Sequence, residues 1–105
     1  MKVVMLNLTA GGLSGGYCKY INKLVPLLLS YPKIERLQVY IPENSSKCIK
    51  NVNKNVINLI PDHDIFSGFK SLKRMILKNN PDVVFIPTAQ WLNIREIPVV
   101  NMVRN

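Results

Sequence analysis

The residues best suited to chemistry are four glycines near the N-terminus, in segment 9–16 (TAGGLSGG). An apolar run precedes them at 2–8, and a helical pattern begins near Tyr17. A loop between a strand and a helix gathers backbone N–H groups at the positive end of the helix dipole, where anions bind. Glycine also lets the backbone approach a ligand closely. The residues expected to form this anion site are Gly11, Gly12, Leu13, Ser14, Gly15 and Gly16.

Two familiar phosphate-binding fingerprints do not match this segment. A P-loop ends in Gly-Lys-Ser/Thr, whereas Gly16 is followed by Tyr17 and Cys18. The dinucleotide pattern GxGxxG fits in no register, and the nearest register has Ala10 at its first glycine. Glu43 is the only acidic candidate for a ribose contact, and it follows a proline. A tight turn that holds no ligand remains the alternative.

Other polar residues add to this site or are set aside. Thr88 and Gln90 follow a short apolar run, at the strand end where ligands of α/β sheets bind. Trp91 would either stack on a sugar or cover the end of the sheet. The motif at 62–64 (Asp-His-Asp) is a poor metal site because adjacent residues rarely converge on one ion, so no metal and no cofactor are expected. Cys18 is expected to serve packing, since two cysteines without a secretory signal do not indicate a disulfide framework.

The composition indicates one folded domain that favours anionic partners. The chain has 105 residues, of which 48% are hydrophobic and 19% are charged, which argues against disorder. Fourteen basic residues against six acidic ones give a net charge of +8. The densest basic stretch holds Lys47, Lys50 and Lys54, which we interpret as a solvated loop, with contact to an anionic membrane surface as the alternative. No nucleic acid partner is expected. The N-terminal apolar run is too short for a signal core or a membrane span, which favours the cytoplasm.

Alternating apolar segments predict the elements that position these residues. We expect strands at 2–8, 37–41, 56–60, 83–86 and 98–103. A first helix begins near residue 17, with its apolar residues at i, i+3, i+4 and i+7, and Pro26 is expected to kink it or stop it early. A second helix is expected at 67–80. The residues expected to face inward on the second helix are Phe69, Leu72, Met75 and Ile76.

Strands that alternate with helices predict an α/β fold. We expect a Rossmann-like, three-layer domain with a mainly parallel sheet of about five strands in the order 3-2-1-4-5. In this order the first strand is central. The glycine segment then lies at the switch point beside the fourth strand, where ligands of such sheets bind.

Three segments resemble the N-terminal domain of group 1 (retaining) GT-B glycosyltransferases. They are the strand and loop KVVMLNL…AGGLSGG, the segment NPDVVFIPT, which is similar to the family's PDVVH strand, and IPVVNMVRN, which is similar to its PVVVTxHN strand. The segments occur in the family's order and span both ends of the chain. The resemblance implies that Gly12 to Gly16 line the cleft near the donor diphosphate or the acceptor. It also places Arg104 where the family commonly has histidine, and Asn105 where it has asparagine or aspartate.

The resemblance further implies an enzyme of two domains, of which residues 1–105 form part of the N-terminal, acceptor-side one. The family's donor-binding C-terminal domain is absent from this chain. The implied partners are a nucleotide-sugar donor and a hydroxyl acceptor, and the chain alone is expected to be inactive and to self-associate through an open sheet edge. Arginine does not shuttle protons near neutral pH but binds phosphate in a bidentate manner, so the sequence leaves Arg104 an anion contact, with a frayed chain end as the alternative. A non-catalytic, Rossmann-like nucleotide-binding or protein-docking module is the alternative.

Overall fold

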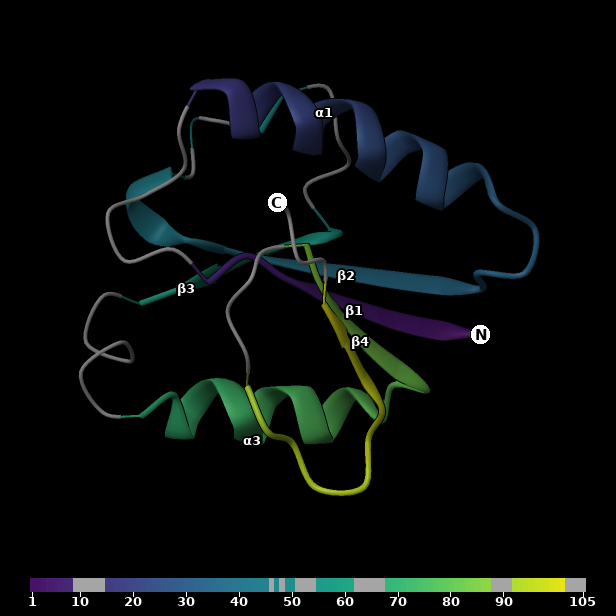
Figure 1. Cartoon of the computed structure of the whole chain (residues 1–105), viewed down its shortest axis with the longest axis vertical. Coiled ribbons are helices and arrows are strands. Elements are labelled where there is room, and N and C mark those ends of the chain that lie inside the picture. Colours follow the sequence, from purple (N-terminus) through teal and green to yellow (C-terminus); the bar gives the residue numbers. More distant parts are fainter. Residues whose placement is uncertain are drawn as a thin grey trace.

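A five-stranded, fully parallel sheet forms the middle layer of the chain, in the order β3-β2-β1-β4-β5 (Figure 1). The computed structural model describes residues 1–8, 15–45, 47, 49–50, 55–61, 68–87 and 92–101. The strands are β1 (Lys2–Leu6), β2 (Arg36–Pro42), β3 (Ile57–Ile60), β4 (Val83–Ile86) and β5 (Val99–Asn101). The predicted α/β class and the predicted strand order are confirmed.

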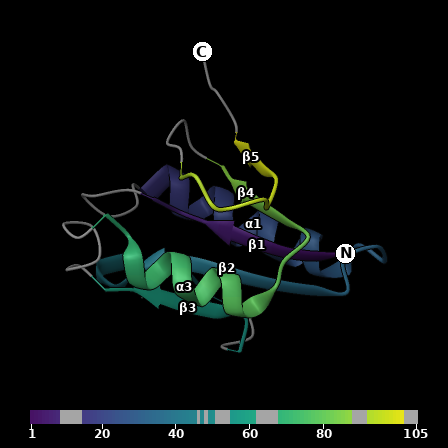
Figure 2. The same ribbon diagram turned by 90° about the horizontal axis from the view of Figure 1, so that it is seen from below.

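Two helices cover opposite faces of this sheet, which makes the three layers. Helix α1 (Gly15–Ser30) lies on one face and α3 (Lys70–Asn79) on the other (Figure 1). Figure 2, viewed from the α3 side, shows α3 in front of the sheet. A short 3₁₀ helix, η1 (Glu43–Ser45), follows β2. This arrangement follows from parallel pairing, because each crossover between parallel strands must pass over one face of the sheet.

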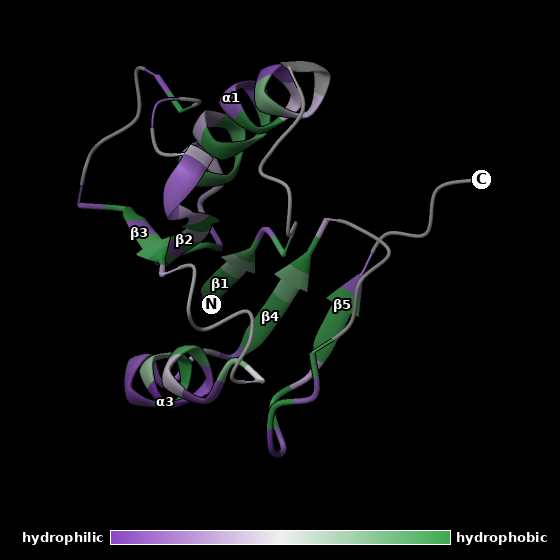
Figure 3. Ribbon diagram, turned by 90° about the vertical axis from the view of Figure 1, so that its left-hand side faces the viewer, coloured by the Kyte–Doolittle hydropathy of each residue, from purple (hydrophilic) through white to green (hydrophobic). Residues whose placement is uncertain are grey.

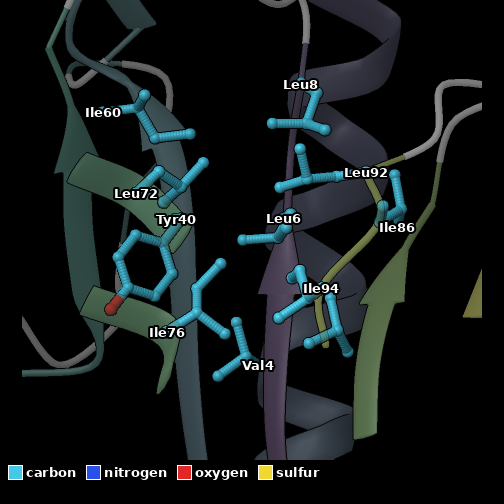
Figure 4. Close-up of a cluster of buried hydrophobic side chains, with 11 residues drawn as sticks. Val4, Leu6, Leu8, Tyr40, Ile60, Leu72, Ile76, Ile86, Leu92 and Ile94 are labelled. Carbon is cyan, nitrogen blue, oxygen red and sulfur yellow. The ribbon is translucent and has the colours of Figure 1, made fainter. Parts of the chain in front are cut away.

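The alternation of side chains along β1 divides the interior into two cores. Val4 and Leu6 point toward α3, and Val3 and Met5 point toward α1. Figure 3 shows the strands coloured as hydrophobic along most of their length, as expected for strands covered on both faces. The core on the α3 side is shown in Figure 4 and contains Val4, Leu6, Leu8, Tyr40, Ile60, Leu72, Ile76, Val84, Ile86, Leu92 and Ile94.

Helix α1 extends through its internal proline. Ile21 and Val25 are completely buried, and Leu24 and Leu28 pack beside them, as the periodicity predicted. The predicted early stop at Pro26 is wrong, since α1 ends at Ser30. Pro26 lies on the exposed side of the helix, so the packing of residues on both sides of it outweighs the hydrogen bond that proline cannot make.

Helix α3 is shorter than predicted and is amphipathic. Leu72 and Ile76 are completely buried, and Phe69 packs against the same core. The inward position predicted for Met75 is wrong, because this side chain is 36% exposed. It lies at the border of the buried face, 100° around the helix from Ile76. Asn80 ends the helix in a left-handed conformation with its N–H bonded to the Leu77 carbonyl, as is common at helix C-termini.

Among the described residues of the α3-side core, Tyr40 alone has an ionisable side chain. It is 2% exposed, and the Asn79 side-chain amide donates a hydrogen bond of 2.8 Å to its hydroxyl. Burial raises the pKa of Tyr40 above its ordinary value of 10.0, and the hydrogen bond from Asn79 acts in the opposite direction with a smaller effect. The folded state therefore favours the neutral phenol.

This raised pKa predicts an alkaline loss of stability that depends on Tyr40. A group whose pKa is raised by folding stabilises the fold below its unfolded pKa, and this stabilisation disappears as pH rises through the folded pKa. We expect the free energy of unfolding to fall between about pH 9 and pH 12, and to fall less steeply in Tyr40→Phe. Urea unfolding at several pH values measures this slope. Tyr31→Phe, at a side chain that is 51% exposed, is the control, and equal slopes in the two variants would contradict the prediction.

Candidate functional site

The candidate site lies at the carboxyl edge of the sheet, where β1 and β4 end side by side. Met5 of β1 is paired with Phe85 of β4, so both strands end one residue later at the same edge. The chain leaves β1 toward α1, on one face, whereas the described part of the connection after β4 lies on the other face, with Ile94 in the α3-side core (Figures 1 and 3). Open α/β sheets bind their ligands at such a switch point, outside the carboxyl ends of the strands.

Asn7, directly after β1, is a fully buried polar residue at this edge. Its backbone N–H and its side-chain amide both donate to the Tyr40 carbonyl of β2, at 3.0 and 2.9 Å. The Tyr17 hydroxyl of α1 donates to its side-chain oxygen at 2.8 Å. Asn7 therefore ties the end of β1 both to β2 and to the first turn of α1. Buried polar groups are stable only when they are bonded in this way.

The start of α1 is held rigidly and carries no compensating negative charge. The rings of Tyr17 and Tyr20 lie 5.9 Å apart with a tilt of 48°, and both pack against the α1-side core. The first turn of α1 contains no acidic residue. The positive end of this helix dipole is thus not neutralised by a carboxylate of its own first turn, which favours an external anion.

The structure describes two of the residues predicted to form the site. Gly15 and Gly16 begin α1, so the glycine segment opens the helix that follows the central strand, as predicted. The other predicted positions lie outside the described residues, as do Trp91 and the Asp-His-Asp motif: Gly11, Gly12, Leu13, Ser14, Thr88, Gln90, Arg104 and Asn105. Pro87, directly before Thr88, is buried beside the end of β1.

Sequence reasoning missed Asn7 and Tyr17. Asn7 is the only polar residue between Val3 and Leu8, and a lone amide in an otherwise apolar run was the available signal. Its partners could not be read from the pattern, because Tyr17 lies in the next helix and Tyr40 in the next strand. Glu43, the residue considered for a ribose, is exposed at the start of η1.

The prediction for Cys18 is wrong. This side chain is disulfide-bonded, whereas a packing role as a buried thiol was expected. The chain has one other cysteine, Cys48, which lies outside the described residues. Near Cys18, the Asn22 side chain accepts a hydrogen bond of 2.7 Å from the Lys50 backbone and donates one of 2.9 Å to the Cys18 carbonyl. A hydrogen bond to Asn22, in the middle of α1, therefore holds the connection after η1 to this helix at Lys50.

The described part of the chain shows neither a metal cluster nor a membrane span. No three His, Cys, Asp or Glu side chains gather within it. None of its helices is long and apolar enough to cross a bilayer.

Comparisons with models of known families, with curated proteins and with solved structures find no match for this chain. The class of the protein is therefore defined by its own geometry: a Rossmann-like α/β domain with a parallel 3-2-1-4-5 sheet.

Removing the Tyr17 hydroxyl should destabilise the domain. Tyr17→Phe leaves the Asn7 side-chain oxygen buried without its donor, which costs about 1–3 kcal/mol of unfolding free energy. Tyr31→Phe removes the same group from an exposed side chain and should change stability by less than about 0.5 kcal/mol. Urea denaturation of both variants gives the comparison. Equal midpoints would show that the Asn7–Tyr17 bond does not hold α1 to the sheet.

Proposed function

We propose that this chain is the N-terminal, acceptor-side part of a glycosyltransferase that moves a sugar from a nucleotide-sugar donor to a hydroxyl acceptor. One observation carries the proposal: the glycine segment joins the central strand β1 to the first turn of α1 at the switch point of the sheet. A nucleotide-sugar donor carries a diphosphate, which is the type of group that such a helix start attracts.

The segments that resemble the GT-B family fall on neighbouring strands, which supports the proposal. KVVML forms β1, VVFI forms β4, and VVN forms β5. These strands are adjacent in the sheet and parallel, so the residues that follow them emerge along one edge. The three segments thus contribute adjacent, parallel strands to one sheet, as a common site at the carboxyl edge would require.

We assign the following roles within this proposal. The glycine segment contacts the diphosphate or the acceptor through its backbone N–H groups, since the start of α1 carries no carboxylate. Thr88 and Gln90 contact the acceptor from the segment after β4. Arg104 binds an anionic group in a bidentate manner, and Asn105 lies beside it. In this proposal the donor nucleotide is held mainly by a second domain, as the resemblance implies.

Valine at Gly15 should weaken anion binding. A β-branched side chain at the first residue of α1 obstructs close approach of a phosphate to the helix start, so the dissociation constant for pyrophosphate or UDP should rise at least about tenfold, or ~1.4 kcal/mol. Isothermal titration calorimetry measures it. Ser71→Val, at an exposed position of α3, introduces the same side chain elsewhere and should leave binding unchanged. An unaltered affinity in Gly15→Val would remove the glycine segment from the site.

The open edge of the sheet at β5 favours self-association of the isolated chain. β5 lies at the end of the strand order and pairs with β4 alone among the described strands. Its Val100 side chain is 52% exposed. An edge strand with one unpaired side and an exposed apolar side chain is a template for pairing with a second chain.

We therefore expect residues 1–105 to transfer no sugar and to self-associate. The reacting groups of a two-sided site meet only across its cleft, and their correct placement is worth roughly 7–11 kcal/mol of barrier. The test assays the chain with a panel of nucleotide sugars and measures its mass in solution by light scattering. If the coding sequence continues past Asn105, the longer protein should be active. If the longer protein binds anions but transfers no sugar, the non-catalytic binding module is favoured. A stable monomer of the chain that turns over a donor would contradict the proposal.

A further inference from the structure

A cavity of about 510 Å³ opens between α3 and the segment 92–95, on the sheet face opposite α1. We call it the α3 groove. The sheet separates it from α1, and neither α1 nor β1 lines it, so it does not belong to the site described above. Its charged lining side chains are all cationic: Lys70, Lys73, Arg74 and Arg95.

Among the residues that the structure describes, no carboxylate compensates the positive charge of the α3 groove. The sequence of α3 contains four cations and no carboxylate. Among the described residues, no acidic side chain forms an ion pair with a cation of the groove. The carboxylates of Asp82 and Glu96 line a neighbouring cavity, and that of Asp82 accepts a hydrogen bond of 2.7 Å from the Lys2 backbone. A concave surface lined by one sign of charge concentrates counter-ions.

Aliphatic side chains accompany these cations. Ile94, which is 3% exposed, and Leu77, which is 43% exposed, line the groove. Met75 is 36% exposed on the same helix. Cations that alternate with exposed aliphatic residues are typical of helices at a membrane surface, where the apolar groups enter the interface and the cations reach the phosphates. Proteins that bind single-stranded nucleic acid instead present aromatic side chains for stacking, and the groove lining contains none.

We propose that the α3 groove is a docking surface for a bilayer of anionic phospholipid. The lipid phosphates lie between α3 and Arg95, and Leu77 and Met75 enter the interface. The groove thereby provides a contact distinct from the basic stretch around Lys47 and Lys50. The inference is independent of the transferase proposal, because it uses a different face of the sheet and another ligand.

The test measures sedimentation of the chain with vesicles of phosphatidylcholine alone and with vesicles that also contain phosphatidylglycerol. The wild-type chain should bind only the anionic vesicles, and binding should weaken with salt. Lys73→Gln/Arg74→Gln/Arg95→Gln should lower the partition coefficient roughly fivefold per cation, about 100-fold in total. The control is Lys19→Gln/Lys23→Gln/Lys33→Gln, which removes the same charge at exposed positions outside the groove and should lower binding far less.

A second pair of variants tests the aliphatic part without changing the charge. Leu77→Ser should weaken vesicle binding several-fold, whereas Leu27→Ser, at a side chain of α1 that is 67% exposed, should not. Circular dichroism and urea midpoints confirm that each variant is folded.

Equal losses in the two triple variants would overturn the proposal, since binding would then follow net charge alone. Vesicle binding that is unaffected by Leu77→Ser but displaced by inorganic pyrophosphate would also overturn it, because it would indicate a site for soluble phosphate. Binding of an oligonucleotide in place of vesicles would overturn it as well.

These outcomes are separable from those at the carboxyl edge. The Gln variants in the groove should bind pyrophosphate at the start of α1 as the wild-type chain does, and Gly15→Val should bind vesicles normally. A failure of vesicle binding would thus leave the transferase proposal intact. A failure of pyrophosphate binding at the start of α1 would likewise leave the membrane proposal intact.

Discussion

The rest of this domain depends on one constraint at β1. This strand is buried on both faces, and its backbone is paired on both edges. From Val3 to Leu6, no side chain of β1 is more than 6% exposed. Its backbone bonds to β2 on one side and to β4 on the other. A strand in this position requires a layer above and a layer below, and its parallel neighbours require crossovers that supply those layers. The positions of α1 and α3 follow from that requirement.

The same constraint makes the carboxyl end of β1 the place where polar chemistry can begin. The interior is apolar along the strand, and Asn7 is the first polar residue that the strand presents after Lys2. Its amide cannot reach water, so it bonds to Tyr40 and Tyr17 instead. In satisfying its own hydrogen bonds it holds the first turn of α1 against the strand end. A helix start held in this way can place its backbone N–H groups without reorganisation when an anion arrives.

Positive charge is concentrated at two places that differ in physical origin. At the start of α1 it comes from aligned peptide dipoles and requires no basic side chain. In the α3 groove it comes from lysine and arginine side chains of α3 and the segment 92–95. The first suits one phosphate group approached at close range, and the second suits an extended, mobile array of phosphates. The two proposed contacts therefore use opposite faces of the sheet, with α1 on one face and α3 on the other.

The sequence by itself determined the class of fold, the order of the strands and the position of the glycine segment, because these depend on local periodicity and on the handedness of crossovers. It also predicted the buried faces of both helices, apart from Met75 at the border of the α3 face. Only the tertiary structure decided that α1 passes through Pro26, that Asn7 meets Tyr17 and Tyr40, and that Arg95 joins the cations of α3 around one cavity. Each of these depends on how elements distant in the chain pack together. A local pattern shows which face of an element is buried, but not which side chain of another element it meets there.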